Sequence, residues 1–549
     1  MKHLQSGGQW LVVLLLTLWG VFPIRAQPPK DATFLSTLGE LREASYSDKA
    51  SIAERLIQTG HSSVRAVLTA LLEERLYFRN SDQKVFIVKS TEGDPLNLID
   101  PLTLKNAGTA SADSLTQIGT NNALRRSLRT TVARFALSSP DVAVRLDAAR
   151  EMSRSLDDPT VTLLRTRLSV ETNSSVRKEI TAALALSALE GADTGARLEA
   201  ISTLSKSVSQ DVRNRLALLL DKAPDGGFVE KDENVRRAAA SALASIDRWR
   251  TFYSGIQTVF FGLSLGSVLV LIAVGLAITF GVMGVINMAH GELMMLGAYT
   301  TYVVQTAMPD HIGISIAVAI PAAFIVAGLA GVVMERTIIR FLYGRPLETL
   351  LATFGVSLIL QQAVRSIFSA NNRSVLTPEW MSGSLRINDA LEITWNRLYI
   401  VIFAMIVFTL IQLVMKRTRL GLDIRAVSQN RAMAKAMGIR TEWVDAMTFG
   451  LGSGIAGVAG VALSQLTNVG PNLGQSYIID SFMVVVFGGV GNLWGSLIGG
   501  MSMGMVNELL EPYAGAVLAK IFVLIALILF IQVRPRGLFP QKGRASEDK

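Results

Sequence analysis

Three polar side chains, Asn287, His290 and Glu292, lie close together in the otherwise apolar stretch VINMAHGELMMLGAY, residues 285–299. Ionisable groups in an apolar segment are costly to bury, so they usually face a cavity or a polar partner. A carboxylate accepts hydrogen bonds, and an amide both donates and accepts them. Asn287 and Glu292 would therefore suit a small polar solute with N–H groups.

Two interpretations of these residues remain open. They line a pathway for a solute, or they cap a broken helix and bond to neighbouring spans. His290 and Glu292 are two residues apart, so they point to different helix faces and need not share one site. Asp480 and Asn492 are further candidates of the same kind.

Catalytic chemistry has little support in this chain. It has no cysteine, which excludes thiol catalysis and cysteine-based metal sites. His61 is the only histidine in residues 27–250, and no G-x-x-x-x-G-K-[ST] sequence is present to bind ATP phosphates. We therefore expect no enzyme activity, no metal site and no cofactor bound by this chain.

The composition divides the 549 residues into two unlike parts. Residues 27–250 contain 31 Lys+Arg and 29 Asp+Glu, whereas residues 251–549 contain only 20 and 15. The first density is typical of a water-exposed domain, and the second is typical of a membrane protein with several spans. Residues 1–26 have the short apolar core of a secretory signal peptide, with an uncleaved anchor as the alternative. Both alternatives place residue 27 onward outside the cytoplasm.

Residues 27–250 are expected to be mainly helical. Similar segments recur at 61–65, 141–145, 173–177 and 233–237, where polar residues precede Val and Arg and then a helix-forming stretch. Polar residues cap helix starts, and Ala and Leu propagate helices well. Repeated helices of this kind predict a HEAT-like stack, with a plain helical bundle as the alternative. Residues 82–120 interrupt the helices with a strand-forming run at 85–88 and several turn signals.

Residues 251–549 predict a polytopic helical domain, which makes the expected fold class all-α. Apolar runs place spans near 259–280, 286–305, 312–334, 347–368, 398–415, 443–466 and 515–533. A glycine-rich run at 478–510 predicts two short crossings or a re-entrant pair. Seven spans with a re-entrant pair, or nine crossings, would leave the two chain ends on opposite sides of the membrane.

The distribution of the net charge of +9 along the chain indicates how the chain is oriented in the membrane. Residues 335–345, 416–440 and 534–549 contribute +2, +6 and +3, and basic loops of this kind stay in the cytoplasm. Loop 369–397 has balanced charge and fits the opposite side. We therefore expect no nucleic-acid partner, a location in a membrane with several crossings and a cytoplasmic C-terminus.

Several separated motifs resemble the permease subunits of branched-chain amino acid and urea ABC importers. They are GVMG at 281–284, the stretch at 285–299, AVSQNRAMAKAMGI at 426–439, VFGGVGNLWG at 486–495 and RPRGL at 534–538. The resemblance covers about residues 255–540. The long domain before it resembles the extension of the urea permease, which makes urea the first expected substrate and branched-chain or other amino acids the alternative.

The resemblance implies a second homologous permease subunit, two ATP-binding subunits that hydrolyse ATP, and a periplasmic substrate-binding protein. It also implies a location among the lipids of the bacterial inner membrane. A short amphipathic helix at 430–437 would contact the ATPases, with its Ala and Met face packed and Arg431 and Lys435 outward. The expected coupling segment also includes Asn430, Ala434 and Gly438. Gly438 would end the helix, because glycine commonly follows the last residue of a helix. The alternative is a solvated loop that only sets orientation.

One function of a different class is an alternative to transport. A membrane receptor or scaffold would use its spans only as an anchor, which the broken, polar spans argue against. The domain at 27–250 is expected to dock the substrate-binding protein or the partner permease, since charge-balanced helical domains more often dock partners than catalyse reactions.

Overall fold

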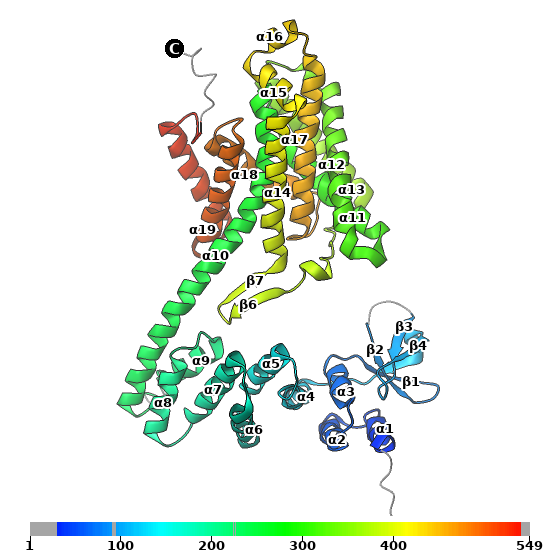
Figure 1. Ribbon diagram of the computed structural model, residues 1–549, viewed down its shortest axis with the longest axis vertical. Helices are drawn as coiled ribbons and strands as arrows, with labels where there is room; N and C mark the ends of the chain where they lie inside the picture. The colour runs from blue at the N-terminus through cyan, green and yellow to red at the C-terminus, as the bar shows by residue number, and fades with distance from the viewer. Residues whose placement is uncertain (1–29, 91–94, 223, 225–226, 540–549) are drawn as a thin grey trace, which may run out of the picture. The chain divides into compact units, whose positions relative to one another are not determined.

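The computed structural model describes residues 30–90, 95–222, 224 and 227–539, and it divides into two compact units, Met1–Ile246 and Asp247–Lys549 (Figure 1). The expected signal peptide at 1–26 lies outside the described residues, and so does the end of the basic tail from 540 onward. The two units are described separately below.

The first unit begins with three helices and a sheet. The helices are α1 (Lys30–Glu40), α2 (Tyr46–Gln58) and α3 (Val64–Leu72). The five antiparallel strands, in the order β4-β3-β2-β1-β5, are β1 (Leu76–Arg79), β2 (Val85–Val88), β3 (Leu96–Ile99), β4 (Asn106–Ala110) and β5 (Leu115–Gln117), with the 3₁₀ turn η1 (Ala112–Ser114). The strand-forming run at 85–88 is β2, which is buried throughout. The sheet corrects the expected all-α class, because β-branched and aromatic residues favour strands here.

Helices fill the rest of the first unit. They are α4 (Asn122–Ala136), α5 (Val142–Met152), α6 (Asp158–Val170), α7 (Ser174–Ala188), α8 (Thr194–Leu204), α9 (Gln210–Leu218) and the start of α10 (Glu233–Met283). Two expected caps are present: Asp141 accepts from the Ala143 amide at 2.9 Å, and Asn173 accepts from the Ser175 amide at 3.0 Å. The likeness to a HEAT stack stays a prediction.

Three of the four recurring Val-Arg pairs have a shared role. Arg145 donates to the Ser139 carbonyl at 2.8 Å, Arg177 to the Glu171 carbonyl at 3.1 Å, and Arg236 to the Glu230 carbonyl at 2.8 Å. Each arginine thus reaches back six residues, to backbone that precedes its own helix. In these three segments the repeat in sequence therefore reflects a repeated way of satisfying partly buried backbone carbonyls.

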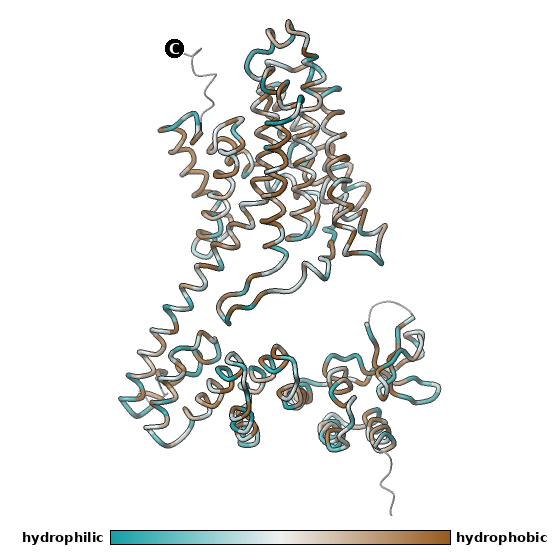
Figure 2. Tube along the Cα trace, in the orientation of Figure 1, coloured by the Kyte–Doolittle hydropathy of each residue, from teal (hydrophilic) through white to brown (hydrophobic). Residues whose placement is uncertain are grey.

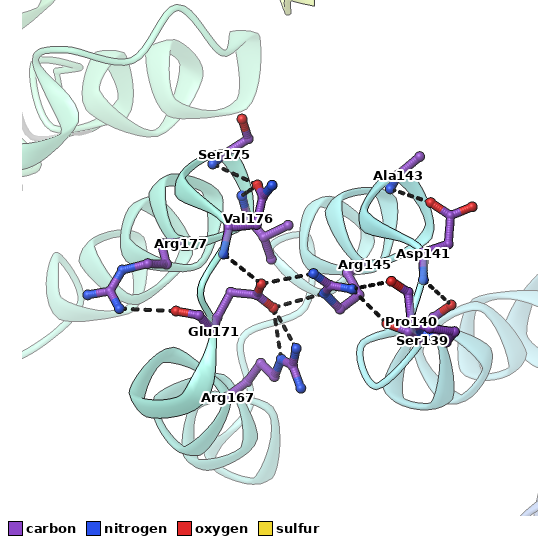
Figure 3. Close-up of polar contacts among 11 residues, drawn as sticks. Ser139, Pro140, Asp141, Ala143, Arg145, Arg167, Glu171, Ser175, Val176 and Arg177 are labelled. Atoms are coloured by element: carbon purple, nitrogen blue, oxygen red, sulfur yellow. Dashed lines mark hydrogen bonds and ion pairs between the residues drawn. The ribbon is translucent and has the colours of Figure 1, made fainter.

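One of these arginines belongs to a buried charge cluster. The Glu171 carboxylate, whose side chain is fully buried, accepts from Arg145 at 2.9 Å and from Arg167 at 2.6 Å (Figure 3). The Asn173 amide donates to the same carboxylate at 3.0 Å. Hydrogen bonds from three sides compensate the cost of burying this charge and fix α5, α6 and α7 around it.

The second unit continues from α10 into a helical bundle. Its further helices are α11 (His290–Ala307), α12 (Ile312–Thr337), α13 (Pro346–Phe368), α14 (Trp395–Arg417), α15 (Arg419–Gln429), α16 (Arg431–Ala436), α17 (Thr441–Ser464), α18 (Leu473–Gly488) and α19 (Leu493–Val533). The hairpin β6 (Ser384–Asn388) and β7 (Leu391–Thr394) precedes α14, and the 3₁₀ turns are η2 (Pro309–His311), η3 (Ile339–Phe341) and η4 (Glu379–Met381). Hydrophobic residues run along most of these helices (Figure 2).

Within the described residues, six helical stretches are long and apolar enough to cross a membrane. They are α10, 309–341, α13, α14, α17 and α19. The predicted span at 286–305 corresponds to α11, which begins only at His290. The glycine-rich run at 478–510 corresponds to the short helix α18 and the first part of α19, separated by residues 489–492.

Helix α19 consists of two antiparallel halves. Gly515, three residues after Pro512, has φ 76° and ψ 160°, outside the helical region and easily reached only by glycine. The side-chain Nδ2 of Asn492, at the start of α19, donates to the carbonyl of Phe539, just beyond the end of α19, at 3.3 Å. The chain therefore reverses at Gly515, and the predicted span at 515–533 is the second half of this hairpin.

Glycine pairs set the closest helix contacts of the bundle. Gly297 of α11 lies directly against the Gly457 backbone of α17. Gly460 of α17 lies against the Met294 carbonyl of α11. A Cβ atom at any of these glycines would overlap the facing backbone. Small residues at such crossings allow two helix backbones to approach closely, and here they fix the position of α11.

Candidate functional site

The start of α11 lies inside the apolar bundle. His290 Nε2 bonds to the Ile272 carbonyl at 3.0 Å, and Ile272 lies eleven residues before the end of α10 at Met283. That separation corresponds to about 16 Å of helix rise. Gly284, with φ +66°, and the non-helical residues after it bring the chain back to this depth. Discontinuous helices of this kind form substrate sites in many transporters.

Asn287 shapes the turn into α11. Its Oδ1 accepts from the Ala289 amide at 3.0 Å, while its Nδ2 is buried without a partner. Thr353 of α13 supports the same turn, because its Oγ1 accepts from the Met288 amide at 3.1 Å. Asn287 therefore has one polar atom in a structural bond and one available.

Glu292 faces α13 from the first turn of α11. Its Oε1 accepts from Ser357 at 3.1 Å and from Gln361 at 2.8 Å, and its Oε2 is buried without a partner. The side chain is 1% exposed, so the free oxygen has no contact with bulk water. The sequence did not lead us to expect Ser357 and Gln361 at this site. Their spacing of four residues, which places two polar side chains on one face of α13, was the pattern that could have indicated it.

His290 and Glu292 point to different helices, as their spacing predicted. His290 bonds to α10, whereas Glu292 bonds to α13. Donation to a carbonyl places the proton on Nε2, and Nδ1 is then an acceptor, buried without a partner. The start of α11 thus combines structural bonds with three unpaired polar atoms, one each on Asn287, His290 and Glu292.

The coupling segment folds into two short helices, α15 and α16. Asn430 caps α16 by accepting from the Met433 amide at 2.9 Å, and Gly438 ends it with φ +88°. Ala434 packs in the apolar cluster with Ile424 of α15 and Val444 of α17. Lys435 is exposed, as expected.

Arg431 is exposed, as expected, and it also makes a contact that the expectation did not include. It pairs with Asp445 of α17, whose side chain is fully buried, and its guanidinium lies 4.7 Å from the ring centre of Tyr343. The Tyr343 hydroxyl donates to Glu335 of α12 at 3.0 Å. Met433 and Met437 are exposed, and the packing of this face against the ATPases stays a prediction. A buried carboxylate attracts the nearest cation, and the lone Asp445 in the predicted span was the signal for this contact.

Asp480 and Asn492 belong to other places in the bundle. Asp480 forms an ion pair with Lys520 of α19 at 2.9 Å. Asn492 caps the start of α19 by accepting from the Trp494 amide at 3.0 Å. Neither joins the cluster at the start of α11. Among the residues that the structure describes, no group of three or more His, Cys, Asp or Glu side chains is placed to hold a metal ion.

Comparison with known proteins covers mainly the second unit. Residues 258–532 match the family described as branched-chain amino acid transport system / permease component. The high-affinity branched-chain amino acid transport permease LivH of Salmonella typhimurium is 31% identical over 305 residues, covering 54% of this chain and 97% of the relative. BraD of Pseudomonas aeruginosa, a permease of the same description, is 29% identical over 307 residues and 98% of its length.

A more distant relative is the ribose import permease RbsC of Escherichia coli, 24% identical over 289 residues, which cover 48% of this chain and 82% of the relative. No solved structure matches the chain. The matches to LivH and BraD leave almost none of those proteins' length for a counterpart of the first unit.

Proposed function

Because the chain belongs to the branched-chain amino acid transport system permease family, we propose that it is a membrane subunit of an ABC importer for branched-chain amino acids. The observation that carries the proposal is the alignment with nearly the whole length of LivH. The relatives favour this substrate over urea, which was expected first. The polar cluster at the start of α11 would line the pathway.

The partners follow from the same proposal. A second homologous permease completes the pathway, two ATP-binding subunits hydrolyse ATP at the end of the bundle that carries α15 and α16, and a periplasmic binding protein delivers substrate. The chain then acts as a transporter subunit without an enzymatic reaction or a cofactor of its own. Its setting would be the bacterial inner membrane, with the first unit outside the cytoplasm.

Urea is a second candidate because of the first unit. LivH and BraD, named for branched-chain amino acid transport, match the chain over 97% and 98% of their length, which leaves almost no residues for a domain like the first unit. The first unit instead resembles the extension of the urea permease. Urea would also match the unpaired acceptor of Glu292 and the unpaired donor of Asn287.

Uptake by cells that lack this chain tests both candidates. Labelled leucine and labelled urea are supplied separately at micromolar concentration to the parent, the deletion strain and the complemented strain. Loss of leucine uptake that complementation restores supports the main proposal. Loss of urea uptake alone supports the second candidate, and unchanged uptake of both solutes contradicts transport of either.

A further inference from the structure

A charged cavity lies in the second unit, and no residue of α11 lines it. Its volume is about 250 Å³, and it is lined by residues of α10, α14, α17, α18 and both halves of α19. Leu265, Leu463 and Leu466 form an apolar part of its wall. The reversal at Gly515 brings Glu508 and Lys520, from the two halves of α19, to the same cavity.

The charges around this cavity are incompletely paired. Lys520 forms an ion pair with Asp480 at 2.9 Å and also lies within 3.4 Å of the Ser476 carbonyl. Arg397, Glu508 and Glu511 form no ion pair within the described part of the chain. The Arg397 guanidinium instead lies 4.1 Å from the ring centre of Phe261. Unpaired charges of both signs therefore surround one space.

One residue that lines this space also has a buried polar atom without a partner. Asn507, which lines the cavity, is 7% exposed, and its Oδ1 accepts no hydrogen bond in the described structure. Leaving such an acceptor unpaired costs free energy that a bound donor would recover. The Asn507 carboxamide is thus a second, independent indication of a ligand with N–H groups.

We propose that this cavity binds a zwitterionic aliphatic α-amino acid. Arg397 and Lys520 face the carboxylate, Glu508 and Glu511 face the ammonium group, and Asn507 accepts one of its N–H bonds. The leucine-lined wall packs against the aliphatic side chain, because burying apolar surface is favourable. A neutral solute such as urea leaves Arg397, Glu508 and Glu511 without an opposite charge. The assignment rests on the proposed function, from which the aliphatic ligand class is taken.

Calorimetric titration of the purified full-length chain in lipid nanodiscs tests the proposal without the ATPases. The probes are leucine, leucinamide, which lacks the carboxylate, 4-methylpentanoate, which lacks the amino group, and urea. Leucine should bind, and each single-charge analogue should bind at least about tenfold more weakly, since a charged hydrogen bond contributes enough to change affinity by that factor. Equal affinity for leucine and either analogue, or tighter binding of urea, overturns the proposal.

Single substitutions then locate the site. Arg397→Gln and Glu508→Gln should each weaken leucine binding at least about tenfold. Arg386→Gln, which removes an exposed arginine of β6 outside the cavity, should leave it unchanged. Leucine binding that both cavity variants retain would place the site elsewhere. The probe series needs only the unmodified chain, so a variant that fails to fold does not decide the outcome.

The two proposals can fail separately. Leucine binding that depends on Arg397, in a chain whose deletion leaves leucine uptake intact, would contradict the proposed function and retain the cavity site. Leucine uptake that requires the chain but is unaffected by Arg397→Gln and Glu508→Gln would contradict the cavity site alone.

Discussion

The two oxygens of the Glu292 carboxylate have different surroundings. One accepts from Ser357 and Gln361, and the other is buried with no partner. A carboxylate held only for structure would normally have both oxygens satisfied, because an unpaired buried acceptor is costly. Under the proposed function, this free oxygen is the atom of the cluster that would meet the transported solute.

Glu292→Gln should lower substrate uptake at least about tenfold, which corresponds to the loss of one charged hydrogen bond. The amount of protein in the membrane should be unchanged, because the glutamine oxygen still accepts from Ser357 and Gln361. Uptake and membrane yield are measured together, with Glu348→Gln at an exposed position of α13 as control. Undiminished uptake would assign Glu292 a structural role only.

Glu171 is a buried carboxylate of the first unit, and its pKa reflects the hydrogen bonds of the charge cluster in Figure 3. Burial raises this pKa, but hydrogen bonds from Arg145 and Arg167 outweigh burial and hold it at about 2, against an ordinary value of 4.5. The folded pKa is the lower one, so the stabilisation is complete above pH 4.5. It is lost as the pH falls from 4.5 toward 2.

Glu171→Gln should destabilise the first unit by about 3–5 kcal/mol at neutral pH, because it leaves the buried Arg145 without its counter-charge. The variant should also lose much of the stability change between pH 4.5 and 2. Thermal unfolding of the full-length chain, followed by circular dichroism across this pH range, measures both effects. Glu233→Gln, which alters an exposed ion pair with Arg237, is the control and should change little.

At the scale of elements, the packing of α11 on α17 holds the site in place. Gly297 and Gly457 bring the two backbones into direct contact, and a Cβ at Gly297 would overlap the Gly457 carbonyl. The partner atoms are backbone, so neither helix can yield without moving as a whole. Glu292, five residues before Gly297 on α11, would move with it.

Gly297→Ala should therefore reduce the yield of folded protein and abolish uptake by the remainder. Gly355→Ala on α13 is the matched control, because nothing lies within 4 Å of a Cβ at that position. Size-exclusion chromatography of the solubilised chains reports folded yield. A normal Gly297→Ala profile would show that α11 and α17 can separate without loss of the fold.

The coupling segment is tied to two long helices by Arg431. This side chain pairs with Asp445 of α17 and lies over Tyr343, which donates to Glu335 of α12. A push on α16 by a docked ATPase would reach α12 and α17 through these contacts, and both helices pack around α11.

Asp445→Asn should separate ATP hydrolysis from transport, since it leaves Arg431 without a carboxylate. In the reconstituted complex we expect more ATP hydrolysed per substrate moved than in the unmodified complex. Arg419→Gln, at an exposed position of α15, is the control. An unchanged ratio, with normal assembly, would limit Arg431 and Asp445 to local stability.

At the scale of the whole molecule, the first unit distinguishes this chain from LivH and BraD. Nearly the whole length of those two proteins aligns mainly with the second unit. Its charge is balanced and its described helices and sheet have cores of their own. These features fit a docking role for the binding protein or the partner permease.

A chain without residues 30–246 should insert in the membrane and yet import substrate severalfold more slowly at limiting supply. Uptake and recovery of the partner subunits are measured for the truncated and complete chains. If both quantities match, the first unit takes no part in delivery or assembly.

The sequence alone determined the features that depend on neighbours along the chain. Apolar runs marked the long helices, the polar stretch at 285–299 marked the start of α11, and capping residues marked helix starts such as those after Asp141 and Asn173. These signals are local, because helix periodicity, caps and hydropathy are read within a few turns.

Only the tertiary structure decided which of these features meet. Glu292 bonds to residues 65 and 69 positions away, Arg431 pairs with the buried Asp445, and Asp480 meets Lys520 beside a cavity that residues of five helices line. Such pairings depend on helix depth and rotation in the bundle, which close glycine contacts and the reversal at Gly515 fix. No local pattern encodes those quantities, since they are set by backbones that approach from distant parts of the chain.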